Sequence, residues 1–365
     1  MGFDIQIKED LKMLVEGIIL KCSMNIQGER TDSAIYHILK GKRSIQTVQD
    51  IHLYQLENFF GVYKSLKKQL FERKINELNA KGFLQRISTS EPLFKTSKAG
   101  VDWLDQSTVE IPYHYFAGLK YNGMANSFFE RLTLLIQTLT NSYMKYYKFI
   151  PVIDTTSVEN WVKALFLKAK SKESYILSTI FQELESLLHY LTDQEAEMFV
   201  DRLSGYKNYG MSIHQLAVKY EMTSEDTQLY FTGIIHRMLT MIENANSSFP
   251  FMSFILKDIS NKHMITNSAN STYTFLKRGY SIDTIAQLRQ LKNNTIYDHI
   301  VEIALYDANF PIHNYVSKED QQKIMKASSI TRSYKLKMIK QSVDEHISYF
   351  QIRLVLAYAK NSLGR

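Results

Sequence analysis

Hydrophobic residues recur every three or four positions through most of the chain, a spacing that predicts amphipathic α-helices. Three such stripes follow one another near the N-terminus, within residues 35–39, 45–53 and 66–78. Ser65 is expected to cap the third helix and Gly82 to end it. Two short apolar runs at 83–87 and 93–96, separated by a polar turn at 88–92, then predict a β-hairpin. Three helices and a hairpin indicate a winged helix, which we place in a domain at residues 1–105.

Residues 106–262 are predicted to form a central helical domain. The stretch 120–190 is dense in aromatic and aliphatic positions, which is typical of a helical packing module. The 23 Tyr and 20 Phe of the chain are expected mainly to fill helix interfaces; stacking on nucleic-acid bases is the alternative. Farther on, Thr192 and Glu195 form a capping box at the start of a helix, Ser212 begins a second helix, and residues 224–227 cap a third.

The segment 191–240 resembles the C-terminal, promoter-reading helix-turn-helix of bacterial sigma factors. One feature departs from that pattern, because the helix that would enter a DNA groove begins with Glu225 and Asp226. Carboxylates at this end favour the helix dipole and oppose nearby phosphates. We therefore expect this segment to serve packing or partner docking, with DNA contact as the alternative.

The C-terminal domain, predicted at residues 263–365, has the clearest local signals. In the run 274–300, Gly279 ends one helix, Ser281 caps the next, and Ala286 is small where the following helix crosses closely. Asn293 or Asn294 is expected to cap the third helix. The inner face of that helix is predicted to consist of Ile296, Ile300 and Ile303.

These residues resemble the helix-turn-helix domain found at the C-terminus of RecQ-type and other DNA helicases. The likeness continues through residues 316–317 and 335–337 into 347–354 and covers about ninety residues. Over the full length, including residues 42–47 and 160–163, the chain is similar to the YpbB-like proteins of Gram-positive bacteria. That resemblance implies a mainly α-helical protein whose helicase is a separate polypeptide.

The net charge of +7 is unevenly distributed: −2 over residues 1–39, +7 over 40–100, −3 over 101–330 and +5 over 331–365. Binding to a polyanion requires several cations on one surface, because the free energy comes from released counterions. The two basic regions are therefore the places to look for DNA contacts; a solvated surface, or a winged helix used for protein contacts, is the alternative. The predicted DNA-binding residues are Lys64, Lys67, Lys68, Arg73, Lys74, Arg289, Lys292, Asn293, Asn294, Thr295, Tyr297, Lys335 and Lys337.

The sequence offers no pattern for catalysis. It contains no phosphate-binding loop, since the glycine pair Gly118 and Gly123 is followed by Met124 and not by lysine. It also lacks a nucleophile elbow and any His or Cys cluster with metal-ligand spacing. We expect no catalytic residue, cofactor or metal, and thus no enzyme.

The cellular setting is predicted from similar absences. The lone cysteine, Cys22, cannot form an internal disulfide and is expected to be a small core residue in a reducing compartment. No apolar window of about 18 residues indicates a membrane span or signal peptide. A cytoplasmic, nucleoid-associated protein is the expectation.

Three functions remain open at this point. The first is a non-catalytic accessory of a separate RecQ-type helicase in DNA repair or recombination, with DNA, the helicase and a single-strand DNA-binding protein as candidate partners. The second is a helix-turn-helix transcription regulator. The third is a protein scaffold in which no module contacts DNA.

Overall fold

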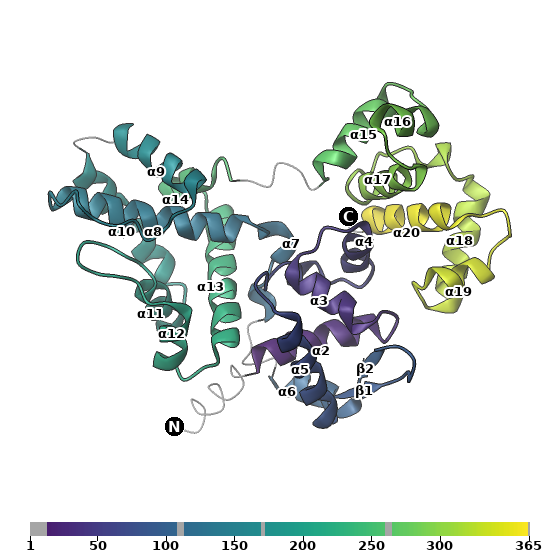
Figure 1. The fold of residues 1–365 in the computed structure, drawn as a ribbon, viewed down its shortest axis with the longest axis horizontal. Coiled ribbons are helices and arrows are strands. Elements are labelled where there is room, and N and C mark those ends of the chain that lie inside the picture. Colours follow the sequence, from purple (N-terminus) through teal and green to yellow (C-terminus); the bar gives the residue numbers. More distant parts are fainter. Residues whose placement is uncertain (1–12, 108–112, 169–171, 260–264, 364–365) are drawn as a thin grey trace. The chain divides into compact units, whose positions relative to one another are not determined.

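A computed structural model of the chain describes residues 13–107, 113–168, 172–259 and 265–363 (Figure 1). The described part is mainly α-helical, and its sheet is a two-stranded hairpin, which confirms the predicted fold class. The chain forms two compact units, each discontinuous in sequence. Unit 1 comprises Met1–Ile19 and Asp102–Asn261, and unit 2 comprises Leu20–Val101 and Lys262–Arg365. Most of the winged-helix segment thus shares a unit with the C-terminal segment, and the three-domain division stays a prediction.

The N-terminal segment has the helices and hairpin expected of a winged helix. Leu84 of β1 pairs with Thr96 of β2 in an antiparallel register, which confirms the predicted hairpin. The elements are α2 (Leu14–Ile26), α3 (Asp32–Lys40), α4 (Ile45–Leu53), η1 (Glu57–Phe59), α5 (Lys68–Ala80), β1 (Leu84–Arg86), β2 (Phe94–Thr96) and α6 (Lys98–Ser107).

Helix α5 ends as predicted but begins later. Gly82, just past its last turn, takes the left-handed backbone (φ +75°) that glycine adopts without a Cβ clash. The predicted cap at Ser65 is wrong: the N-cap is Lys67, and its side chain makes no capping bond. Leu66 is buried and donates its N–H to the Tyr63 carbonyl at 3.1 Å. Residues 63–66 therefore form a separate turn, and α5 starts after it.

The C-terminal segment contains six helices and a short 3-10 turn in its described part. Ser281 caps α16 by accepting the Thr284 N–H at 3.2 Å, as predicted. The predicted asparagine cap of α17 is wrong, because Lys292 is the N-cap and makes no side-chain bond there. The elements are α15 (Asn267–Lys277), α16 (Ile282–Arg289), α17 (Asn293–Tyr306), η3 (Ile312–Asn314), α18 (Lys318–Thr331), α19 (Leu336–Gln341) and α20 (Tyr349–Leu363).

Helix α17 lies at the centre of unit 2. Its predicted inner face of Ile296, Ile300 and Ile303 is fully buried. The helix packs against α15 and α20, and also against α4 of the winged-helix segment, which in turn contacts α20. The two segments of unit 2 therefore share an apolar core. Cys22 is buried, as predicted, and burial raises the pKa of its thiol.

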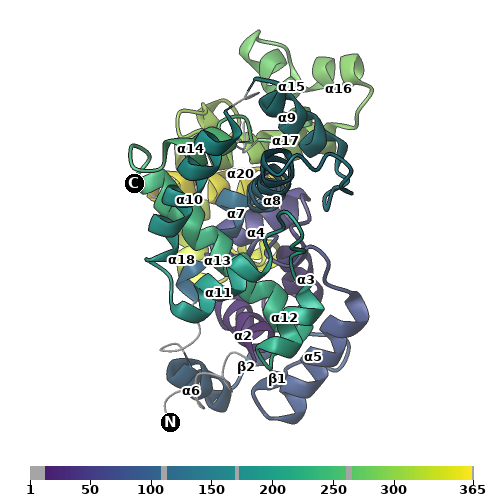
Figure 2. The same cartoon turned by 90° about the vertical axis from the view of Figure 1, so that its left-hand side faces the viewer.

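Unit 1 is built around two long helices, α8 and α13 (Figure 2). Helix α8 packs against α9, α10, α13 and α14. The capping box of Thr192 and Glu195 is present, and Ser212 begins α12 with a second one. Helix α13 is capped by Thr223, one residue before the predicted start. The elements are η2 (Tyr113–Tyr115), α7 (Gly118–Tyr121), α8 (Met124–Tyr143), α9 (Thr156–Lys168), α10 (Glu173–Leu188), α11 (Asp193–Asp201), α12 (Ile213–Lys219), α13 (Ser224–Asn244) and α14 (Pro250–Leu256).

Among the described helices of both units, none combines the length and the apolar character needed to span a membrane.

Candidate nucleic-acid interface

Helix α5 presents the predicted cations of the winged helix. Its apolar side chains Phe71, Ile75 and Leu78 recur at helical spacing and are buried, so the opposite face points outward. On that side Lys67, Lys68 and Arg73 are exposed, as is Lys64 before the helix, whereas Lys74 is half-buried. The helix therefore has the cationic face that phosphate contact requires.

Carboxylates on the same helix partly neutralise this face. Glu72 lies 3.4 Å from Lys68, and Glu77 lies 3.7 Å from Arg73 and 3.6 Å from Lys74. The exposed pairs made by Lys68 and Arg73 contribute only about 0.3–0.5 kcal/mol each, so a phosphate can displace them at small cost.

Lys64 lies next to a second cation. Desolvation lowers the pKa of its ammonium group, and the nearby positive charge of Arg43 lowers it further. An approaching phosphate would relieve that repulsion.

The first turn of α17 is the second candidate surface. Lys292 and Asn294 are exposed and Thr295 is half-buried, so the predicted contact residues are accessible. The turn carries no acidic residue, and the free N–H groups of a helix N-terminus attract anions. A cation, an amide and a hydroxyl therefore meet at this helix end, where the Asp283 carboxylate of α16 also lies 2.7 Å from the Asn293 side chain.

Two other predicted DNA-binding residues, Arg289 and Asn293, have partners inside the protein. Arg289 donates to the Ser268 carbonyl at 2.8 Å, to Ser268 Oγ at 3.0 Å and to Thr272 Oγ1. Asn293 donates its side-chain N–H to Asp283 Oδ1 at 2.7 Å. Their polar groups thus join α15, α16 and α17 to one another.

Tyr297 is also engaged within unit 2. Its ring stacks on Phe350 of α20, with the ring centroids 4.3 Å apart and the planes at 25°. One face of the aromatic ring is therefore covered by the protein and cannot stack on a base.

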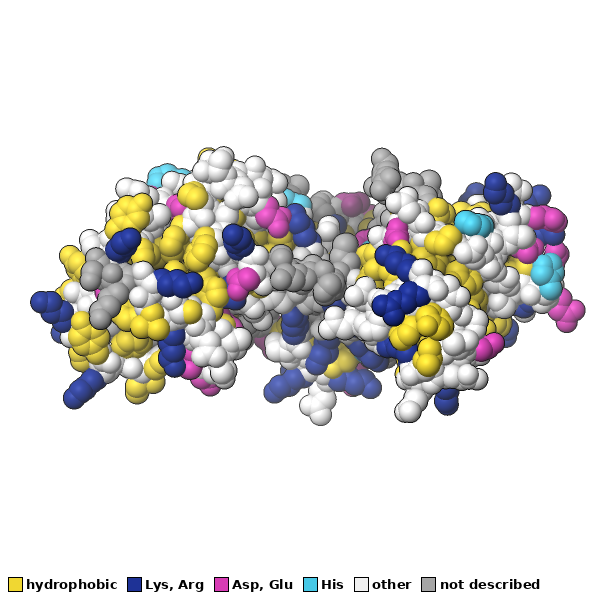
Figure 3. Space-filling model, turned by 90° about the horizontal axis from the view of Figure 1, so that it is seen from above, with side chains coloured by type: hydrophobic (Ala, Val, Ile, Leu, Met, Phe, Trp, Pro, Cys, Tyr) yellow, Lys and Arg dark blue, Asp and Glu magenta, His cyan; other side chains and the backbone are white. Residues whose placement is uncertain are grey.

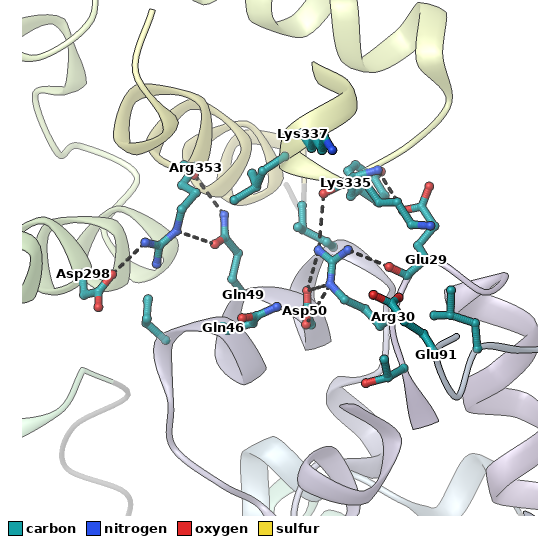
Figure 4. Close-up of a pocket in the computed structure, with 16 residues that line it drawn as sticks. Glu29, Arg30, Gln46, Gln49, Asp50, Glu91, Asp298, Lys335, Lys337 and Arg353 are labelled. Carbon is teal, nitrogen blue, oxygen red and sulfur yellow. Dashed lines mark hydrogen bonds and ion pairs between the residues drawn. The ribbon is translucent and has the colours of Figure 1, made fainter. Parts of the chain in front are cut away.

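Lys335 and Lys337 line a cavity of about 670 Å³ between the two segments of unit 2 (Figure 4). Lys337 is exposed and Lys335 is half-buried. Within the described part of the chain, neither ammonium group has an ion-pair partner. The other lining residues are Glu29, Arg30, Thr31, Ile45, Gln46, Gln49, Asp50, Leu53, Glu91, Leu93, Asp298, Tyr334, Leu336 and Arg353.

The cavity also contains two arginines that the sequence did not single out. Arg30 lies 3.0 Å from Asp50, and Arg353 lies 2.7 Å from Asp298 (Figure 4). Gln49 of α4 donates to the Arg353 carbonyl at 3.1 Å and accepts from its guanidinium at 3.3 Å, which ties α4 to α20. No local pattern marks these pairs, because the partners are distant in sequence.

Asp50 is the most deeply buried acid of the cavity wall. Desolvation raises the pKa of its carboxyl to about 6, and the adjacent Arg30 charge opposes that rise. Burial and the ion pair thus shift the pKa of this carboxyl in opposite directions, as expected of a group with a structural role.

In the segment 191–240, one of the two acids expected to oppose phosphates is used internally, whereas the other, Glu225, is half-buried. Asp226 is fully buried and accepts the Val15 N–H at 2.9 Å and the Thr223 hydroxyl at 2.6 Å. Its carboxylate therefore satisfies the N-terminal turn of α2, which favours the packing interpretation of this segment.

One acidic cluster in the described part has metal-ligand types. The ligand atoms of Asp320, Asp344 and His346 lie within 4.8 Å of one another. Lys323 Nζ is 2.8 Å from Asp344, and His346 Nε2 is 3.1 Å from Asp320. The carboxylates of the cluster are thus already engaged within the protein, by the Lys323 ammonium group and the His346 ring.

Comparison with known proteins agrees with this geometry. Residues 268–356, which span α15 to the middle of α20, match a family described as a helix-turn-helix domain, and such a domain indicates DNA binding. Over 340 residues the chain is 31% identical to Protein YpbB of Bacillus subtilis (strain 168), covering 93% of this chain and 96% of that protein. No solved structure matches the chain significantly. By its near full-length similarity and its C-terminal domain, the chain belongs to the YpbB family of helix-turn-helix proteins.

Proposed function

We propose that the chain is a non-catalytic, DNA-binding accessory protein of a separately encoded RecQ-type helicase, acting in DNA repair or recombination at the nucleoid. The observation that carries the DNA-binding part is the exposed, acid-free first turn of α17 within a helix-turn-helix domain. The same unit contains the exposed cations of α5. Two electropositive helix faces in one unit supply the cations that a polyanion requires.

The helicase part rests on the resemblance of the C-terminal domain to the corresponding domain of RecQ-type helicases. In a helicase this domain is covalently attached to a motor, whereas here it accompanies a winged helix and a helical unit. A separately encoded helicase motor is therefore the partner that would bring this domain and a motor together, as in a helicase. A single-strand DNA-binding protein is a further candidate partner.

DNA binding is tested by charge removal on α5. Each phosphate contact contributes about 0.9 to the slope of log affinity against log salt for duplex DNA, so Lys67→Ala/Lys68→Ala should reduce that slope by about 1.8. The matched control is Lys318→Ala/Lys326→Ala, which removes two exposed cations from α18 of the same unit. Equal slopes for wild type and the α5 variant would remove the winged helix from the proposal.

The helicase partnership is tested by co-purification with the RecQ-type helicase of the same organism, at low salt and with DNA present. Recovery of the helicase, and faster unwinding of a forked duplex when the wild-type chain is added, are expected. Failure to recover it would contradict the accessory role. One high-affinity site with base-pair discrimination would instead favour a transcription regulator, and absence of any DNA binding would favour a scaffold.

A further inference from the structure

Unit 1 has an exposed surface in which tyrosines alternate with lysines. Helix α8 ends at Tyr143, and the connection after it begins Met144-Lys145-Tyr146-Tyr147-Lys148. Tyr143, Tyr146 and Tyr147 are 58%, 48% and 70% exposed, and both lysines are exposed as well. Several exposed rings close together in the chain mark a candidate binding surface.

A second segment with the same character lies against the first. The turn between α11 and α12 contains Tyr206, Lys207 and Tyr209, of which Tyr209 is 74% exposed. The Tyr206 N–H donates to Thr140 Oγ1 on α8 at 3.0 Å, and the rings of Tyr146 and Tyr206 lie 6.0 Å apart at 65°. Two segments about sixty residues apart thus meet at Tyr146 and Tyr206, and their tyrosines and lysines together are called the Tyr/Lys surface. It consists of Tyr143, Lys145, Tyr146, Tyr147, Lys148, Tyr206, Lys207 and Tyr209.

The backbone beneath this surface is fixed from inside unit 1. Gln137, a buried residue of α8, donates to the Ile150 carbonyl at 3.0 Å and accepts the Val152 N–H at 3.0 Å. The far end of the connection is therefore pinned to the helix that precedes it. A surface held in place in this way loses little conformational entropy when a ligand binds.

Two lysines of the surface occupy backbone conformations that favour glycine. Lys145 (φ +56°) ends α8: its N–H bonds the Ser142 carbonyl at 2.9 Å, and the next N–H bonds the Asn141 carbonyl at 2.8 Å. Lys207 (φ +54°) lies in the second segment. Among the described residues these are the lysines with positive φ, and both lie here. Glycine adopts this backbone without strain, so either lysine can be changed to glycine without loss of the turn.

Charge on this surface is nearly uncompensated. In the described part of unit 1, no carboxylate forms an ion pair with Lys145, Lys148 or Lys207. The nearest acid shown by a contact is Glu173, which accepts the Ser142 hydroxyl at 3.3 Å. In Figure 3, Lys and Arg side chains are interleaved with hydrophobic ones over the left-hand part of the molecule, where unit 1 lies.

We propose that the Tyr/Lys surface binds single-stranded nucleic acid, with unpaired bases stacked on the tyrosine rings and phosphates near the lysine ammonium groups. A duplex keeps its bases stacked inside the helix, whereas a single strand offers both groups to such a surface. This site lies in a different unit from the helix faces assigned to duplex binding, and it does not depend on that assignment.

The first test uses the full chain and a labelled oligo-dT of about 20 nucleotides, with an abasic oligonucleotide of equal length for comparison. Tyr147→Ala/Tyr209→Ala should weaken oligo-dT binding about 25-fold or more, because stacking on each ring contributes about fivefold or more and the two factors multiply. It should leave abasic and duplex binding unchanged. Tyr147→Phe/Tyr209→Phe keeps the rings and should bind as wild type does. Oligo-U in a parallel series distinguishes RNA from DNA as the strand bound.

Tyr190→Ala is the matched control, since this tyrosine of unit 1 is also exposed (63%). It follows the C-terminal end of α10, whereas the N-terminal end of that helix, at Glu173, contacts Ser142 beside the Tyr/Lys surface. It should bind oligo-dT as wild type does. Unchanged affinity of the double Ala variant would overturn the proposal and leave the surface to a protein partner. Equal losses in the Ala and Phe variants would overturn base stacking.

A second variant separates binding from folding. Lys145→Gly removes one cation and places glycine where the left-handed backbone favours it, so thermal stability should be kept or raised. The salt dependence of oligo-dT binding should nevertheless fall by about 0.7 in slope, the value for one phosphate contact on a single strand. A stable variant with an unchanged slope would overturn the role of the lysines. Loss of duplex binding by α5 variants is a different result and bears on the proposed function alone.

Discussion

Arg289 was predicted from the sequence to contact DNA, yet its guanidinium holds three helices of unit 2 together. It donates to the carbonyl and hydroxyl of Ser268 on α15 and to Thr272 Oγ1, and it lies 3.4 Å from His299 Nδ1 on α17. Arg289→Ala should therefore lower stability, and it should leave the salt dependence of DNA binding unchanged in the folded protein.

The size of the effect follows from these contacts. A hydrogen bond to a charged group contributes about 1.5–3 kcal/mol, but such contributions are not additive. Thr272 Oγ1 and His299 Nδ1 remain bonded to each other at 2.8 Å after the change, and the Ser268 groups can reach water. We therefore expect a loss of about 2 kcal/mol, which corresponds to a fall of about 4–8 °C in melting temperature for a unit of this size.

Two measurements on the same variants distinguish structural from DNA-contacting residues. Hydrogen exchange of α15 and α16, with thermal unfolding, reports stability, and anisotropy titrations between about 50 and 200 mM salt report phosphate contacts. Lys292→Ala is the matched change, since Lys292 is exposed at the start of α17. It should alter stability by less than about 0.5 kcal/mol and reduce the salt slope by about 0.9.

The opposite outcome for Arg289 would refute this reasoning. If Arg289→Ala melts at the wild-type temperature while its salt slope falls by about 0.9, the guanidinium binds phosphate and its internal contacts are incidental.

Three further outcomes are expected. Burial and the Arg289 charge lower the pKa of His299 in the folded protein, so the unfolded chain takes up the proton first and unit 2 should lose stability as pH falls below about 6.5. His299→Asn should flatten this dependence of stability on pH. Parallel profiles for the variant and wild type would show that His299 is not the group responsible. Glu77→Gln frees the cations of α5 and should tighten duplex binding up to about fivefold at low salt, whereas weaker binding would place α5 away from DNA. Glu183→Ala leaves the N–H groups of Phe251 and Met252 at the start of α14 without their buried acceptor, and should lower the free energy of unfolding by about 2–4 kcal/mol in urea titrations. Glu183→Gln should recover part of this loss. A wild-type midpoint for the Ala variant would contradict the capping role.

Features decided within a few residues of the chain were predictable from the sequence. The capping box of Thr192 and Glu195, the cap at Ser281 and the turn at Gly82 depend on hydrogen bonds and φ angles that close locally. The hairpin and the buried face of α17 follow from hydrophobic periodicity in the same way.

Local patterns were less reliable where a neighbour competes for the side chain. An asparagine cap of α17 was predicted, but the Asn293 amide is used by Asp283 of α16. The tyrosines were expected mainly in helix interfaces, yet Tyr147 and Tyr209 are largely exposed on unit 1. Periodicity describes a helix face and says little about a connection between helices, where these two rings lie.

The sequence by itself determined that the chain is mainly helical and where several caps and turns lie, and it supplied the basic residues that are candidates for DNA contact. Only the tertiary structure decided which of those residues remain available: Lys292 is exposed, whereas Arg289 and Tyr297 are engaged by α15 and α20. It also joined α4 to α17 and α20 in one core. The physical reason is that a polar or aromatic side chain binds whichever partner folding brings near, and those partners come from segments that the local pattern does not connect.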